Sequence, residues 1–323
     1  MQSHLQKAAF LARPLVKASR SCPWCGDRDG RQIWVEDRYR YVRCLNCRGT
    51  FSDLTAEEYA TTRHNVWDEV DPTDESLSFY GDARQAAHMA FLRRFPPFGA
   101  GKLLDVGCGL GFFLERAQRT GWNVSGCDTS KTWAALANER LGANRVRVGP
   151  VENLASDEYF DLVCAWDVIE HIYDPIPFLR SCARLLAPGG MLFLRTPNLA
   201  YVLPLYTLRR RIFRHRAAVL GPTNHVVYFT AHSLRRALTA VGLGSLEFPV
   251  FPPPQIAVSD SPLRRFNRES SMSVRLKNAW AGLAGLAAER TGGRIVLGAD
   301  LDVIAQPAGR PPPWSGGGQV ARR

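Results

Sequence analysis

The segment Leu103-Leu104-Asp105-Val106-Gly107-Cys108-Gly109-Leu110-Gly111-Phe112-Phe113 decides the fold class of this chain. Its apolar start predicts a short buried strand, and its three glycines predict a tight turn that a ligand can approach closely. The apolar residues at its end predict a helix after the turn. A strand, a glycine-rich turn and a helix in this order are typical of nucleotide-binding α/β proteins.

Strand-like and helix-like segments alternate on both sides of this turn. Short apolar runs predict strands at 102–106, 123–127, 145–148, 160–166 and 191–195, and helices at 112–120, 131–141 and 177–186. We expect the last of these helices to stop at Pro188-Gly189-Gly190. The alternation predicts an α/β fold with a mostly parallel sheet, and strands within 245–251 and 295–304 would bring it to seven strands. A further short helix is expected at 233–241.

Two carboxylates accompany the glycine turn. Asp105 lies on the strand just before Gly107, and Asp128 follows the end of the second predicted strand. The Gly-x-Gly-x-Gly spacing differs from the Gly-x-Gly-x-x-Gly of dinucleotide enzymes. A carboxylate beside the turn suits a ligand with an ammonium group better than a pyrophosphate, and a carboxylate after the second strand can accept the hydroxyls of a ribose. The alternative interpretation is a packed turn without a ligand.

With these features the chain resembles the class I S-adenosylmethionine-dependent methyltransferases, which have a Rossmann-like fold. Phe160–Ile172 is similar to the family's fourth strand and the loop after it. Leu185–Asn198 resembles the fifth strand of the ubiquinone-type methyltransferase branch, and His225, Tyr228 and Phe229 resemble that branch's later His-x-x-Tyr-Phe segment. The resemblance covers roughly residues 101–250 and the last strand.

The resemblance implies that the chain binds S-adenosylmethionine and transfers its methyl group. It implies cofactor contacts by Asp105, Gly107, Gly109 and Gly111 at the methionine part, Asp128 at the ribose, Val151 and Glu152 beside adenine, and Trp166 and Asp167 at the sulfonium side. Pro150 departs from the family pattern, in which an acid at this place often accepts a hydrogen bond from the adenine amino group. Proline has neither a side-chain acceptor nor an N–H.

Two histidines are candidate general bases, because an oxygen acceptor has to lose a proton during methyl transfer. His171 follows the fourth predicted strand, and His225 follows an arginine-rich insertion. Each could instead brace its loop through a hydrogen bond. The Asn/Asp-Pro-Pro-aromatic run of methyltransferases that act on the amino groups of bases is replaced here by Trp166-Asp167-Val168-Ile169, so base N-methylation loses support. No set of metal-binding carboxylates is apparent near this place.

Four cysteines near the start of the chain form two Cys-x-x-Cys knuckles, Cys22 with Cys25 and Cys44 with Cys47. This spacing predicts a closed, structural zinc site with four cysteine ligands. A hairpin over 32–35 and 39–42 would lie between the knuckles, and the metal would supply folding energy to so small a module. Redox-active cysteines are the alternative. The remaining four cysteines lie in apolar surroundings that are typical of small core residues.

Composition divides the chain into four parts. Residues 1–50 are a basic lead and the zinc ribbon, 51–100 a helical linker or cap, 101–305 the cofactor-binding domain with insertions near 199–220 and 252–294, and 306–323 a tail that we expect to be disordered. No run of about 18 or more apolar residues and no secretory apolar core occurs, so neither a membrane span nor a signal peptide is expected. We therefore expect a cytoplasmic protein.

Three functions fit these features. The first is a methyltransferase for a small-molecule acceptor, with an oxygen of a sugar, a lipid-linked compound or a secondary metabolite as the methylated atom. The second is an RNA methyltransferase, because the net charge is +11 and the zinc ribbon is rich in arginine. The third is a zinc-dependent interaction protein without catalysis. The insertion at 199–220 mixes apolar residues with arginines, so it could lie on a membrane surface or form an ordinary lid.

Overall fold

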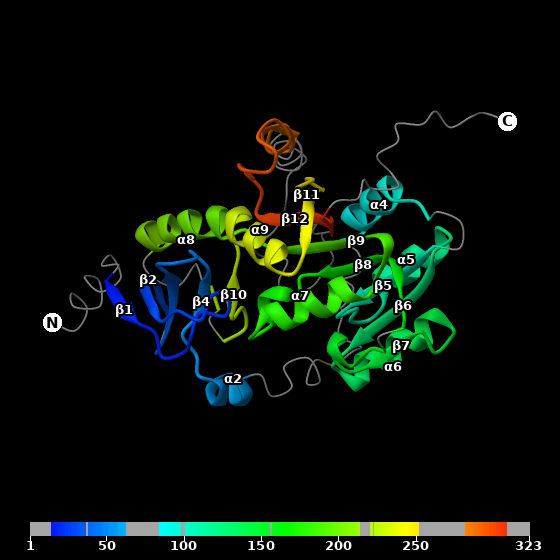
Figure 1. The fold of residues 1–323 in the computed structure, drawn as a ribbon, viewed down its shortest axis with the longest axis horizontal. Coiled ribbons are helices and arrows are strands. Elements are labelled where there is room, and N and C mark those ends of the chain that lie inside the picture. Colours follow the sequence, from blue (N-terminus) through cyan, green and yellow to red (C-terminus); the bar gives the residue numbers. More distant parts are fainter. Residues whose placement is uncertain are drawn as a thin grey trace.

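The computed structural model describes residues 14–36, 38–62, 84–97, 101–155, 157–213, 220–221, 223–251 and 282–308. These residues form two sheets. A five-stranded sheet has the order β1-β2-β3-β4-β10, and a seven-stranded sheet has the order β11-β12-β9-β8-β5-β6-β7. The five-stranded sheet lies at one end of the molecule and β5–β7 at the other, as Figure 1 shows.

The seven-stranded sheet confirms the predicted fold class. Its strands are β5 (Lys102–Val106), β6 (Asn123–Asp128), β7 (Val146–Val148), β8 (Phe160–Trp166), β9 (Leu186–Pro197), β11 (Leu243–Glu247) and β12 (Asp300–Pro307). β5 to β9 run parallel, and β12 and β11 are antiparallel to their neighbours. The strand order reverses at β5, which pairs with β6 on one side and β8 on the other. Ligands of open α/β sheets bind at the carboxyl ends of the strands beside such a reversal.

Helices cover both faces of this sheet, as a largely parallel sheet requires. They are α4 (Gln85–Arg94), α5 (Phe112–Arg119), α6 (Lys131–Leu141), α7 (Pro175–Arg184) and α9 (Ala231–Ala240). Ser130 is the N-cap of α6 and accepts a hydrogen bond of 3.2 Å from the backbone N–H of Trp133. α9 begins with a reciprocal capping box between Thr230 and Ser233.

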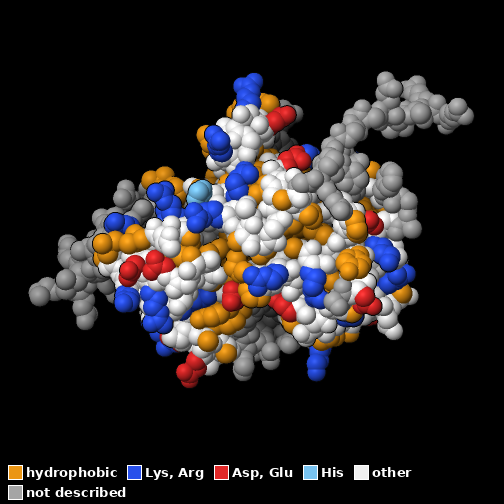
Figure 2. All heavy atoms as spheres, in the orientation of Figure 1, with side chains coloured by type: hydrophobic (Ala, Val, Ile, Leu, Met, Phe, Trp, Pro, Cys, Tyr) orange, Lys and Arg blue, Asp and Glu red, His pale blue; other side chains and the backbone are white. Residues whose placement is uncertain are grey.

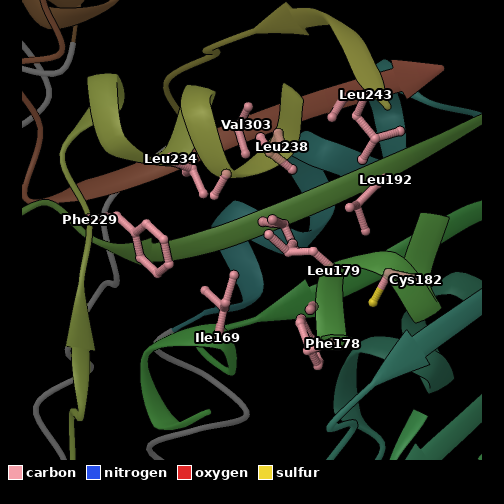
Figure 3. Close-up of a cluster of buried hydrophobic side chains, with 14 of the residues drawn as sticks. Ile169, Phe178, Leu179, Cys182, Leu192, Phe229, Leu234, Leu238, Leu243 and Val303 are labelled. Atoms are coloured by element: carbon pink, nitrogen blue, oxygen red, sulfur yellow. The ribbon is translucent and has the colours of Figure 1, made fainter. Parts of the chain in front are cut away.

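Alternate residues of the strands pack into two separate hydrophobic cores, one on each face of the sheet. On one face, Leu192 of β9 and Val303 of β12 pack with α7 and α9, whose side chains there are Phe178, Leu179, Cys182, Leu234 and Leu238 (Figure 3). Phe193 points to the opposite face and packs with α4 and α5. Cys108, Cys127, Cys164 and Cys182 are all buried, which agrees with their interpretation as core residues.

The predicted end of the helix before β9 was wrong. α7 ends at Arg184, and β9 already begins at Leu186, so Pro188-Gly189-Gly190 lies within the strand. The pairing of β8 with β9 shifts register here, because Phe160 pairs with Leu186 whereas Leu162 pairs with Met191. A Cβ on Gly190 would lie 2.8 Å from the carbonyl oxygen of Phe160. Gly190 is therefore required by the close approach of β8 to a bulged part of β9, and not by a free turn.

Other boundaries also moved. β11 ends at Glu247 instead of continuing to residue 251, and β12 spans 300–307 instead of 295–304, so it enters the range expected to be disordered. In the arginine-rich insertion, α8 spans Leu199–Phe213. The structure also has a helix over 282–290, within the 252–294 insertion. Residues 252–281, which form most of that insertion, and the tail from residue 309 lie outside the described residues.

The five-stranded sheet contains the predicted hairpin and extends beyond it. Its strands β1 (Leu15–Lys17), β2 (Asp29–Glu36), β3 (Tyr39–Cys44), β4 (Thr50–Ser52) and β10 (Val227–Tyr228) are antiparallel. We call β1–β4 with the two cysteine-bearing knuckles the ribbon. After the ribbon come the short helix α2 (Ala56–Thr62) and then α4, which is part of the domain core. None of the helices in the described ranges is both long and apolar enough to cross a membrane.

A buried ion pair joins β9 to the antiparallel strand β12. The Nε of Arg195 lies 2.6 Å from one carboxylate oxygen of Asp302, and its NH2 lies 2.7 Å from the other. We expect Asp302→Ala to lower the free energy of unfolding by about 3–5 kcal/mol, because it leaves a buried guanidinium without its counter-ion. Urea denaturation measures this loss. The exposed pair of Arg94 and Glu247 supplies the control, and Glu247→Ala should cost less than about 1 kcal/mol. Equal costs for the two variants would contradict this account.

Candidate active site

A cavity opens at the carboxyl ends of β5, β6 and β8, where the strand order predicts a ligand. It contains about 1180 Å³ of space, counted with its open mouth. Its wall includes Arg84 and His88 at α4, Asp105–Leu110, Asp128 and Thr129, Gly149–Glu152, and Trp166–Val168 with His171, and residues at α5, α6 and α7 complete it. All nine predicted cofactor contacts except Gly111 line this cavity.

The glycine turn after β5 leaves no room for side chains. Gly107 has a φ of 67° and Gly109 a φ of 54°, in the left-handed region that favours glycine. A Cβ on Gly107 would lie 2.7 Å from a methyl group of Val168. Gly111 is the N-cap of α5, also with a positive φ, and packs against Ala137 of α6. Backbone therefore forms this wall of the cavity, and Gly111 supports it from behind.

Asp128 ties the tip of β6 to the glycine turn. One of its carboxylate oxygens accepts a hydrogen bond of 2.9 Å from the backbone N–H of Gly109, and the other accepts one of 2.9 Å from that of Ser130. An ionised carboxylate has about four lone-pair positions, so it can accept further hydrogen bonds from a ligand. The residue is only partly buried and lines the cavity. Its geometry suits the hydroxyls of a ribose.

Asp105 is buried on β5 with one unsatisfied oxygen. Its Oδ1 has no hydrogen-bond partner among the described residues, and the residue is 3% exposed. Burial raises the pKa of Asp105 well above its usual value, and the nearby carboxylate of Asp128 raises it further. A buried acceptor at a cavity wall requires a donor or a positive charge to satisfy it. An ammonium group of a ligand would supply both.

Trp166 and Asp167 lie at the tip of β8 with different surroundings. The ring of Trp166 packs against Phe193 and Phe113, at centroid distances of 4.4 and 5.1 Å, so most of it belongs to the core. Asp167 has a positive φ of 54° and forms an ion pair of 2.7 Å with Arg84. The pair closes the side of the cavity next to α4.

Sequence reasoning missed Arg84 and His88. It treated residues 51–100 as a linker or cap, whereas α4 packs into the domain core and brings both residues to the cavity. His88 stacks edge-on against Trp166 at 4.6 Å, and its Nδ1 lies 3.1 Å from Arg116. Burial lowers the pKa of His88 well below its usual value. The available signal was the helical spacing of Ala87, His88 and Phe91, which share one buried face.

The two candidate bases lie together, but only one lines the cavity. His171, in the short helix η2 (Ile169–His171), belongs to the wall, and its ring centroid is 4.8 Å from that of His225. Nδ1 of His171 lies 2.9 Å from the carbonyl oxygen of Asn224, so this nitrogen carries the proton and Nε2 holds the lone pair. His225 lies behind His171, and burial lowers its pKa below the usual value.

Glu170 completes this group. It is buried, its Oε2 accepts a hydrogen bond of 3.0 Å from the hydroxyl of Thr196, and burial raises its pKa well above the usual value. The potential ligand atoms of Glu170, His171 and His225 lie within 4.8 Å of one another. The group contains one carboxylate and two histidines, and the fold brings these residues together although Glu170 and His225 are separated by more than fifty positions.

The four knuckle cysteines of the ribbon form the second cluster. Their sulfurs lie within 4.8 Å of one another, with 3.4 Å between those of Cys22 and Cys47 and 3.6 Å between those of Cys25 and Cys44. A tetrahedral zinc ion with Zn–S bonds of about 2.3 Å would separate its ligand sulfurs by roughly 3.8 Å. All four sulfurs fit as ligands, so the site would be closed and structural. Its chemistry would be to stabilise the ribbon.

We expect Cys44→Ser to abolish zinc binding and to lower the melting temperature by about 5 °C or more, since about 1 kcal/mol corresponds to roughly 2–4 °C in a domain of this size. Cys22, Cys44 and Cys47 belong to the same hydrophobic cluster as α7 and α9, so loss of the ribbon fold would affect the main domain. Elemental analysis and differential scanning calorimetry provide the two measurements. Cys182→Ala should retain zinc as a buried-cysteine control, and full zinc content in Cys44→Ser would refute the ligand set.

Comparisons with known proteins agree with this architecture. A family model described as a methyltransferase domain matches residues 80–247, just over half of the chain. The ubiquinone biosynthesis O-methyltransferase of Caulobacter sp. (strain K31) is 41% identical over 108 residues, which cover 32% of this chain and 43% of that protein. The same-named protein of Xanthomonas axonopodis pv. citri (strain 306) is 40% identical over 154 residues, which cover 46% and 62%.

The chain thus spans about half the length of the curated relatives that it matches. A solved SAM-dependent methyltransferase from Archaeoglobus fulgidus has a TM-score of 0.45 and 22% identity, and the match covers 72% of this chain and 99% of that one. The family match spans α4, the glycine turn, both carboxylates and both histidines. This chain belongs to the methyltransferase domain family.

Proposed function

We propose that this protein transfers the methyl group of S-adenosylmethionine to an oxygen of a small-molecule acceptor. The observation that carries the proposal is the buried, unsatisfied carboxylate oxygen of Asp105 at the wall of a cavity whose adjoining turn has glycine at positions 107 and 109. An ammonium group satisfies that oxygen, and the glycine turn admits the methionine part of the cofactor without steric conflict. When bound, the cofactor supplies a methyl group on an activated sulfonium leaving group.

Different residues of the cavity hold different parts of this cofactor. Asp105 accepts from the ammonium group, and Asp128 accepts from the ribose hydroxyls while it braces Gly109. Val151 and Glu152, in the short helix η1 (Val151–Asn153), border the adenine end of the cavity. Because the leaving group is already activated, accurate positioning supplies much of the rate.

His171 is the base that we assign to an oxygen acceptor. It lines the cavity, and the carbonyl of Asn224 accepts a hydrogen bond from Nδ1, so Nε2 is the nitrogen that we assign as the base. His225 lies behind it and does not line the cavity, so we assign it a supporting role and not proton transfer. The curated relatives are named as O-methyltransferases, which also favours oxygen as the methylated atom.

The acceptor side adjoins α8 and the ribbon. Leu199 and Leu203 of α8 are buried against the ribbon residues Trp34 and Tyr41, whereas Leu205 and Leu208 are 38% and 53% exposed. The apolar exposed edge of α8 favours an acceptor with an apolar part, such as a lipid-linked compound. On the face shown in Figure 2, Lys and Arg side chains are scattered among acidic and apolar ones and do not form one stripe.

The cofactor assignment predicts that Asp128→Ala weakens binding of S-adenosylhomocysteine, the demethylated product, by at least about tenfold. The reason is the loss of charge-assisted hydrogen bonds, which contribute about 1.5–3 kcal/mol each. Isothermal titration calorimetry measures the affinity. Asp157→Ala, at an exposed site away from the cavity, should bind as the unmodified protein does. Unchanged affinity in Asp128→Ala would remove Asp128 from the cofactor site.

The acceptor assignment is tested with radiolabelled S-adenosylmethionine and cell extract separated into RNA, lipid, polysaccharide and small-metabolite fractions. We expect label in the lipid or small-metabolite fraction. His171→Gln should reduce this labelling about 100-fold without changing affinity for S-adenosylhomocysteine, as expected for loss of a general base. His232→Gln, an exposed histidine of α9, is the matched control. Label in RNA alone would overturn the small-molecule assignment, and full labelling by His171→Gln would overturn the assigned base.

A further inference from the structure

The strand that follows His225 belongs to the sheet of the zinc ribbon. Val227 and Tyr228 of β10 pair with Phe51 and Thr50 of β4, and the backbone N–H of Ser52 donates a 2.8 Å hydrogen bond to the carbonyl oxygen of Val226. We call residues 223–229 the acceptor segment. The ladder between β4 and β10 joins this segment to a ribbon nearly two hundred positions earlier in the chain.

A tyrosine of the ribbon reaches the backbone of this segment directly. Tyr41 of β3 is fully buried, and its hydroxyl donates to the carbonyl oxygen of His225, with the carbonyl oxygen of Leu220 as a second acceptor at 3.3 Å. Its ring meets that of Tyr228 edge-on, with centroids 5.5 Å apart. Tyr41 therefore holds the backbone of His225 by a hydrogen bond and the side chain of Tyr228 by packing.

Leu220, three positions before the acceptor segment, is also held by the ribbon. The backbone N–H of Leu220 donates a 3.0 Å hydrogen bond to the carboxylate of Glu36 at the end of β2. Leu220, Tyr41 and Tyr228 share one apolar cluster with Trp34 of the ribbon and Leu199 of α8. Contacts of three kinds, which are a strand ladder, side-chain hydrogen bonds and apolar packing, thus lock the segment to the ribbon.

The acceptor segment in turn orients both histidines. The carbonyl of Asn224 accepts from Nδ1 of His171. The hydroxyl of Tyr228 donates 3.1 Å to the carbonyl of Leu220, so its lone pair is left to accept from Nδ1 of His225, also at 3.1 Å. Each ring is therefore held with its proton on Nδ1 and its lone pair on Nε2.

We infer that Tyr41 is a positioning residue, through which the ribbon sets the orientation and tautomer of His225 and, through the backbone of the acceptor segment, of His171. The inference deepens the proposed function, because it explains how the base at the cavity is oriented. It also assigns the ribbon a role inside the enzyme, as a template for the acceptor side, in place of RNA docking. A mere stabiliser of the core would not control which ring nitrogen carries the proton.

Tyr41→Phe tests the inference, since it removes one hydroxyl and keeps the ring. The full-length, zinc-loaded protein is labelled with ¹⁵N in its histidine rings. In the unmodified protein we expect His171 and His225 to carry their protons on Nδ1, and in Tyr41→Phe we expect the His225 signals to move toward an average of the two tautomers. We expect the backbone amides of the acceptor segment to exchange with deuterium at least about tenfold faster.

Tyr39→Phe is the matched control, because Tyr39 lies two residues away on β3. Within the described residues, its hydroxyl accepts a hydrogen bond from the exposed Arg38 alone. It should leave the ring signals, exchange rates and zinc content unchanged. In Tyr41→Phe, zinc content should stay the same, and affinity for S-adenosylhomocysteine should change less than twofold. Ring signals and exchange rates like those of the unmodified protein would overturn the inference.

A second variant keeps the inference testable if the Tyr41→Phe protein does not fold. Tyr228→Phe removes the acceptor for Nδ1 of His225 and should shift the tautomer of His225 alone, because His171 is held by the Asn224 carbonyl. An unchanged His225 signal in this variant would likewise overturn the inference. Binding of S-adenosylhomocysteine by the unmodified protein tests the proposed function separately. If the unmodified protein does not bind it, the proposed function fails, whereas the ring signals still test the role of Tyr41.

Discussion

The hydrogen bond between the backbone N–H of Gly109 and the carboxylate of Asp128 joins the tips of β5 and β6, and the candidate site depends on it. It fixes a turn in which Val168 and Trp133 leave little room for side chains at Gly107 and Gly109. The same carboxylate also fixes the start of α6 through the N–H of Ser130. One charged group thus shapes the backbone wall of the cavity, orients a helix and remains able to meet a ligand. Asp105 lies close by, and the repulsion between the two carboxylates favours a positively charged ligand between them.

The sheet around this turn needs support on both faces and at its antiparallel edge. The two hydrophobic cores provide the first, because alternate residues of β9 and β12 point to opposite sides. The ion pair of Arg195 with Asp302 supports the antiparallel part of the sheet by joining β9 to β12. It lies behind the cavity, with the guanidinium 5.1 Å from the ring centre of Trp166. The buried ion pair between β9 and β12 is therefore in contact with Trp166 at the tip of β8. α4 adds Arg84 and His88 to the cavity, so the part of the chain before the sheet contributes to the site as well.

The ribbon is integrated into the enzyme domain. Its cysteines share a hydrophobic cluster with α7 and α9, its β4 pairs with β10, and Arg20 stacks on the ring of Tyr173 with 3.4 Å between the guanidinium carbon and the ring centre. A zinc site in such a position can stabilise the acceptor side without taking part in chemistry. This arrangement explains how a small module with little core of its own is stabilised, since metal and neighbouring domain both contribute.

Local pattern alone determined the glycine turn, the strands from β5 to β8, both carboxylates at the strand tips and the four-cysteine ligand set. Each of these depends on residues close together in sequence, where spacing and side-chain type suffice. Only the tertiary structure decided that Pro188-Gly189-Gly190 forms a bulge in β9, because that depends on the partner strand β8. Only it placed His88 and Arg84 at the cavity, joined β10 to the ribbon and brought Glu170 and His171 beside His225. These features arise from pairing and burial between distant segments, which a pattern confined to one segment does not encode.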